Sequence, residues 1–97
     1  MTKFVYDKNG DAVGFKLGPY IFDIKGDPIG QTLDTHIFDL SGEYVGEFYK
    51  DMIVDMNMNI GNVSAQKPPG NVGSSGNPSN RGAVGYGYPD VFYKLLR

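Results

Sequence analysis

The chain has 97 residues, of which 40% are hydrophobic and 21% charged, and its formal net charge is −2. A chain of this length builds one domain with a modest core. The absence of cysteine excludes disulfides and thiolate chemistry, and a single histidine argues against a histidine-rich metal centre or a Ser/His/Asp triad. No apolar run approaches the roughly 18 residues of a membrane span, and no signal-peptide core is visible, so we expect a cytoplasmic domain.

A sixteen-residue repeat begins near the N-terminus. Residues 4–14, 20–30 and 36–46 share an aromatic-aliphatic-aromatic triplet, an aspartate and two glycines, all in the same order. A fourth, less regular copy starts at Met52 and has Met58 where the others have their first glycine. The repeated aspartates are Asp7, Asp23, Asp39 and Asp55. The first glycines are Gly10, Gly26 and Gly42, and the second are Gly14, Gly30 and Gly46.

Each repeat unit predicts a β-hairpin. The triplet has strand propensity, and Asp-x-x-Gly is turn chemistry because aspartate accepts nearby backbone N–H groups while glycine adopts a positive φ. Hairpins this small must bury their apolar faces against one another. The middle column predicts the shared core: Val5, Ile21, Ile37 and Ile53. The next column predicts a second apolar layer: Tyr6, Phe22, Phe38 and Val54.

The fold class is therefore all-β, with four tandem hairpins around a pseudo-fourfold axis or in a small closed meander. The repeated Asp-x-x-Gly-x-x-apolar-Gly units resemble the four-fold beta-flower domain of bacterial proteins. The resemblance covers roughly residues 3–62. It implies the flower-like arrangement of hairpins and carries no activity with it.

The composition changes after Gly61. Of residues 61–89, 19 of 29 are glycine, proline, asparagine or serine, which is typical of a linker or flexible arm. We therefore expect a hairpin domain over residues 1–62, a glycine-rich arm or linker over 63–88, and a short docking helix over 89–97. Pro89 suits the first turn of that helix. A helix this short is unstable alone, so it must dock on its own domain, a second copy or a partner.

Charge favours docking of the arm. Residues 1–60 contain 10 acidic and 5 basic residues, whereas residues 61–97 contain 1 acidic and 4 basic residues. An acidic body and a basic arm attract each other. Docking within one chain is the simplest outcome. Exchange of the arm between copies, giving a homo-oligomer, and capture of another protein are the alternatives.

The candidate site residues each have a structural explanation beside the functional one. The four repeated aspartates are weak candidates for a metal site, because Ca²⁺ takes oxygen ligands, but each also suits its own turn. His36 stands in register with large apolar residues, and no base or nucleophile is evident beside it. Nucleic-acid binding is opposed by the acidic body. The candidates for an interaction surface are His36, Tyr86, Tyr88, Phe92, Tyr93 and Leu96.

Two functions follow from these observations. The first is a non-catalytic interaction or scaffolding module, without a cofactor, whose arm docks on its own or a neighbouring subunit and which meets an unknown protein partner. The alternative is a small-ligand or metal-ion binder, or a minor enzyme, that uses a cup at the hairpin axis. The first function is favoured because the sequence shows no group of residues arranged for acid–base catalysis. The sequence predicts no membrane and no nucleic-acid partner.

Overall fold

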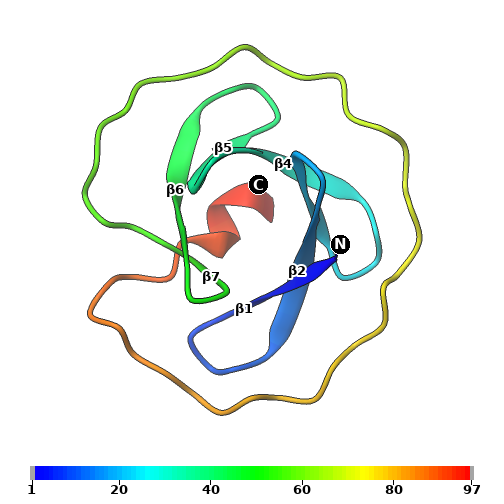
Figure 1. Cartoon of the computed structure of the whole chain (residues 1–97), viewed down its shortest axis with the longest axis vertical. Helices are drawn as coiled ribbons and strands as arrows, with labels where there is room; N and C mark the ends of the chain where they lie inside the picture. The colour runs from blue at the N-terminus through cyan, green and yellow to red at the C-terminus, as the bar shows by residue number, and fades with distance from the viewer. Residues whose placement is uncertain (1, 97) are drawn as a thin grey trace.

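A computed structural model describes residues 2–96 and contains a single antiparallel sheet. Its strands pair in chain order, each with the next. The strands are β1 (Lys3–Tyr6), β2 (Ala12–Leu17), β3 (Tyr20–Asp23), β4 (Pro28–Leu33), β5 (His36–Asp39), β6 (Tyr44–Tyr49) and β7 (Met52–Val54). The backbone N–H of Tyr6 donates to the carbonyl of Asp51 at 2.8 Å, so the first and last strands meet. The sheet is thereby nearly closed into a ring (Figure 1).

Three hairpins confirm the predicted repeat. Oδ1 of Asp7 accepts the backbone N–H groups of Asn9 and Asp11 at 2.9 and 3.0 Å, and Asp23 makes the same two bonds in the second hairpin. Each hairpin has a register shift at the same place in its first strand. The turn glycines have φ values of +86°, +95° and +99°: Gly10, Gly26 and Gly42. These conformations favour glycine because it has no Cβ.

The predicted core column lies at the centre of the ring. All four of its members are fully buried: Val5, Ile21, Ile37 and Ile53. Burying each such side chain stabilises the fold by about 1.5–3 kcal/mol. The second layer is also buried at Phe22, Phe38 and Val54. Tyr6 is half-buried, and Cζ of Arg81 lies over it, 4.3 Å from the centroid of the Tyr6 ring. Phe15 is buried as well and stacks on Phe22 at 5.1 Å.

The prediction of a fourth hairpin was wrong in its second strand. Within the described residues, positions 56–61 form no strand beside β7. Residues 89–91 take that place: the N–H of Val91 donates to the carbonyl of Ile53, and the N–H of Asp55 donates to that of Pro89, at 3.0 and 2.9 Å. The physical reason is Met58, because the turn of the other units needs a positive φ that methionine avoids.

The arm passes around the outside of the sheet (Figure 1). It runs against the order of the hairpins and meets the third turn first. The N–H groups of Val63, Val72 and Arg81 donate to the carbonyls of three turn glycines at 2.9, 3.0 and 3.0 Å. Those glycines are, in the order met, Gly42, Gly26 and Gly10. The arm is thus hydrogen-bonded to every complete hairpin while its side chains stay largely exposed.

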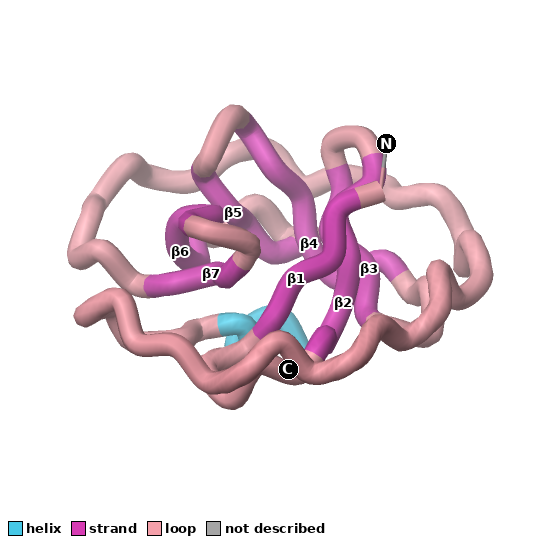
Figure 2. Tube along the Cα trace, turned by 60° about the horizontal axis from the view of Figure 1, so that its bottom comes forward, coloured by secondary structure: helices cyan, strands magenta, loops and turns pink. Residues whose placement is uncertain are grey.

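The C-terminal segment forms a 3₁₀-helix, η1 (Phe92–Leu96), shorter than the helix expected over 89–97. It lies at the centre of the ring in Figure 1, and Figure 2 places it beneath the strands, opposite the N-terminus. Val91, Phe92 and Leu95 are buried in one cluster with the core column. Residues 2–96 contain no helix with the length and apolarity that a bilayer crossing requires.

Candidate functional site

The second glycine column makes room for the C-terminal segment. A Cβ on Gly14 would lie 3.1 Å from Cζ of Phe92, and one on Gly30 would lie 3.1 Å from Cδ2 of Leu95. A Cβ on Gly46 would lie 2.9 Å from Cγ2 of Val91. The backbone oxygens of Phe22, Phe38 and Val54 on the neighbouring strands come closer still to these three positions. Since none of these glycines has a positive φ, close approach, and not backbone conformation, is what requires them. We call residues 91–96 the plug, because they fill the axis of the ring.

The plug leaves two large apolar side chains outside. Tyr93 is 61% exposed and Leu96 is 58% exposed. They are three residues apart, and a 3₁₀-helix has three residues per turn, so both face the same way. The inner side of η1 therefore belongs to the core, and its outer side offers an apolar patch at the centre of one face of the molecule.

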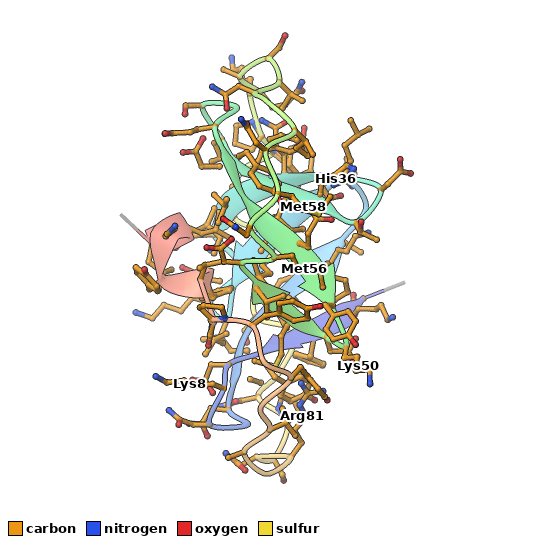
Figure 3. All side chains as sticks on the ribbon, turned by 90° about the vertical axis from the view of Figure 1, so that its left-hand side faces the viewer. Lys8, His36, Lys50, Met56, Met58 and Arg81 are labelled. Atoms are coloured by element: carbon orange, nitrogen blue, oxygen red, sulfur yellow. The ribbon has the colours of Figure 1, made fainter. Side chains whose placement is uncertain are left out.

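Acidic clefts flank this patch. One has a volume of about 760 Å³ and the other about 300 Å³, and Leu96 lines both. The carboxylates on their walls are Asp7, Asp23, Asp39, Glu43 and Asp90. Their basic residues are Lys8 and Lys94. We call Tyr93, Leu96 and these carboxylates the η1 face. In Figure 3, Lys8 lies on the same side of the molecule as η1, whereas His36 and Lys50 lie on the opposite side.

The repeated aspartates are used mainly by their turns. Asp39 accepts the hydroxyl of Ser41 and the N–H of Glu43, at 2.6 and 2.9 Å. These donors outweigh the effect of burial and hold the pKa of the Asp39 carboxyl below its ordinary value. Asp55 accepts the N–H of Asn57 at 2.7 Å. Within residues 2–96, no three histidine, aspartate or glutamate side chains come together as a metal site.

A second polar cluster surrounds Glu47 on the opposite face. Glu47 is only 4% exposed, and its carboxylate accepts the hydroxyls of Tyr44 and Thr35 at 2.5 and 2.9 Å. Nδ1 of His36 lies 2.8 Å from Oε2 of Glu47. Burial raises the pKa of Glu47, but hydrogen bonds from Tyr44, His36 and Thr35 outweigh it, so the pKa lies below its ordinary value. Burial and the bond to Glu47 raise the pKa of Tyr44. The cluster gives His36 a partner that sequence reasoning did not find.

We expect this cluster to make stability fall at both ends of the pH range. A lowered carboxyl pKa contributes stability above the unfolded value of about 4.3, and that stability is lost as the pH falls through the folded pKa. The raised pKa of Tyr44 contributes stability below about pH 10, which is lost as the pH rises above it. Tyr44→Phe should remove the alkaline loss and cost about 1–3 kcal/mol at pH 7. Urea unfolding from pH 2.5 to 11 measures both effects, and unchanged stability of the variant at pH 7 would contradict the assignment.

The remaining interaction candidates lie in different places. Tyr86 and Tyr88 both pack edge-on against Tyr49, with ring centroids 5.6 and 5.7 Å apart. Nζ of Lys50 lies 4.9 Å from the centroid of Tyr86. These rings hold the returning end of the arm on β6. Phe92 is in the core, so Tyr93 and Leu96 are the two candidates that the fold presents together.

Sequence reasoning missed the asparagines that hold the arm. The amide of Asn71 donates to the carbonyl of Lys25 and to Oδ1 of Asp27 at 3.1 and 2.8 Å. Asn80 makes the same pair of bonds to the first hairpin, at 2.9 and 2.8 Å. Asn62 accepts the N–H of Tyr44 in the third. These three asparagines are nine residues apart in the arm, and that spacing is the signal that would have revealed them.

The geometry defines a class of small all-β domain: a ring of hairpins with its axis filled by the C-terminus and its rim bound by an arm. The chain matches the 4-fold beta flower protein family over residues 3–88, and it belongs to that family. The matched region takes in the arm as well as the hairpins. No curated protein and no solved structure matches the chain.

Proposed function

We propose that the chain is a non-catalytic interaction module that binds a partner protein on the η1 face. The observation that carries this proposal is the exposure of Tyr93 and Leu96 side by side between two acidic clefts. Large apolar side chains grouped in this way mark interaction sites, and aromatic side chains are enriched among the residues that dominate binding energy. The alternative of a cup at the axis has less support, because the plug fills that position.

The charge of the η1 face favours a basic partner. Five carboxylates and two lysines line the clefts, so the field beside Leu96 is negative. Complementary charge steers association and weakens with salt. We therefore infer a partner segment with aliphatic or aromatic anchors flanked by lysine or arginine.

Binding to such a segment can be measured with a twelve-residue peptide of alternating lysine and leucine, titrated into ¹⁵N-labelled protein. We expect chemical-shift changes confined to η1 and the turns beside it, and weaker binding as salt is raised. Leu96→Ser should weaken binding about tenfold. Val72→Ser is the matched control, because Val72 is an exposed apolar residue of the arm. Equal binding by the two variants, or shifts spread over the whole molecule, would overturn the proposal.

A further inference from the structure

Gln31 is a buried polar residue outside the η1 face. It is only 7% exposed, on β4, and occupies the position equivalent to Glu47 in the preceding repeat unit. Its Nε2 donates to the carbonyls of Asp39 and Ser64 at 3.0 and 3.2 Å. Both partners are backbone carbonyls, which only accept hydrogen bonds, so the orientation of the amide is determined. The side-chain oxygen, Oε1, therefore needs a hydrogen-bond donor from another group.

The repeat explains why Oε1 has none. Glu47 receives hydrogen bonds from Thr35, His36 and Tyr44. The residues sixteen positions earlier are Pro19, Tyr20 and Pro28. Proline has no donor, and the hydroxyl of Tyr20 makes no hydrogen bond to Gln31, so Oε1 accepts no hydrogen bond from any residue between 2 and 96. Since no fully buried side-chain oxygen of these residues lacks a partner, Oε1 must be at least partly accessible to solvent.

Gln31 lines a cleft between the sheet and the arm, and Oε1 is the side-chain atom of Gln31 without a hydrogen-bond partner. The cleft has a volume of about 290 Å³, and Tyr20, Leu33 and Val63 are among its walls. Leu33 is 55% exposed. The arm forms one wall and is held there by the bonds from Val63 and Gln66 to the third turn, at 2.9 and 3.1 Å. None of the lining residues is charged. Thr32 and Gln66 add polar groups to its walls. A cleft with mostly apolar surface and a few polar groups, one of them with a determined orientation, is typical of a small-molecule site.

We propose that this cleft binds a small, uncharged aromatic molecule carrying one N–H or O–H donor. The donor binds Oε1 of Gln31, and the ring packs between Tyr20, Leu33 and Val63. A charged ligand is disfavoured because no lining side chain would compensate its charge. The volume lies just below the range of about 300–1,000 Å³ for ligand pockets, which limits the ligand to about one fused ring system. The site is separate from the η1 face and does not depend on the function proposed for it.

Indole and 1-methylindole test this proposal, because they differ at the N–H donor. Each is titrated into ¹⁵N-labelled full chain while the side-chain amide of Gln31 and the backbone of Leu33 and Val63 are followed. For indole we expect saturable shifts confined to the cleft, with a Kd of about 1 mM. For 1-methylindole we expect binding at least tenfold weaker. Equal affinity for the two compounds, or no shift with either, would overturn the proposal.

Variants locate the binding on the protein. Leu33→Ser removes an exposed wall of the cleft without disturbing the core, and it should weaken indole binding at least threefold. Val72→Ser changes another exposed apolar residue, in the arm and outside the cleft, and should leave indole binding unchanged. If Leu33→Ser binds indole as the unaltered chain does, indole is not in the cleft and the proposal fails.

Discussion

Replacing Gly46 with valine is expected to lower the free energy of unfolding by about 3–5 kcal/mol. The added Cβ would lie 2.9 Å from Cγ2 of Val91 and 2.5 Å from the backbone oxygen of Val54. The second contact is with backbone, which cannot rotate away. Departure of the plug would leave the contact with Val54 in place, so β6 must move, which distorts the sheet and its packing against Val91 of the plug. The loss is a large fraction of the stability of a small domain.

Urea unfolding followed by circular dichroism measures this loss. Gly70→Val is the matched control: Gly70 lies in the arm, has no positive φ, and a Cβ there meets nothing within 4 Å. It should remain within about 0.5 kcal/mol of the unaltered chain. Equal stability of the two variants would contradict the close approach of β6 to Val54 and to the plug.

Replacing Gly10 with alanine should release the arm from the first hairpin. The Cβ would meet the backbone of Gly82, 2.7 Å from its nitrogen, where the N–H of Arg81 donates to the carbonyl of Gly10. The arm must lift to relieve this contact, so the bond after Arg81 becomes accessible to trypsin. We expect cleavage there to be at least tenfold faster than in the unaltered chain.

The control for this prediction is Gly73→Ala. Gly73 has a φ of +84°, close to the +86° of Gly10, but a Cβ there has nothing within 4 Å. Both alanines bear the cost of a left-handed backbone, about 1–2 kcal/mol, and only the one at Gly10 also contacts the arm. If trypsin cleaves after Arg81 equally fast in both variants, backbone strain and not the arm contact accounts for the effect.

The hairpins could be predicted from the sequence because their chemistry is local. Asp23 bonds to groups two and four residues away, and Gly26 supplies the turn conformation within the same few residues. The buried middle column followed from strand alternation. The strand partner of β7 could not be predicted, because residues 89–91 lie about 35 positions away and nothing local marks Val54 as their neighbour.

The second glycine column and the arm show where composition misleads. Gly14 was read only as part of the repeat, but a Cβ there would meet both the backbone oxygen of Phe22 on the neighbouring strand and the ring of Phe92, which is distant in sequence. The arm has the composition of a linker, and its side chains do lack a core of their own. It is nevertheless held by backbone bonds and by asparagines such as Asn71 and Asn80, which composition alone does not reveal.

The sequence predicted only some of the residues of the candidate sites. Tyr93 and Leu96 were identified from the apolar tail, but the sequence could not separate them from Phe92, because a 3₁₀-helix divides the tail differently from an α-helix. Gln31 and Glu47 were missed. The sequence pattern that could have identified them is a repeat position that holds Phe15 in the first unit and polar residues in the next two. A polar residue at a position that is otherwise apolar indicates a buried polar group that needs hydrogen-bond partners.

The central claim is that the plug completes the ring of its own chain. Nuclear Overhauser effects between the ring of Phe92 and the α protons of Gly14 test it directly. In a uniformly ¹³C,¹⁵N-labelled sample, this cross-peak should be present. In an isotope-filtered experiment on an equal mixture of labelled and unlabelled chains, it should be absent. A cross-peak between labelled and unlabelled chains would show that the plug fills a neighbour's ring, and its absence from both samples would show that the axis is not filled by the plug.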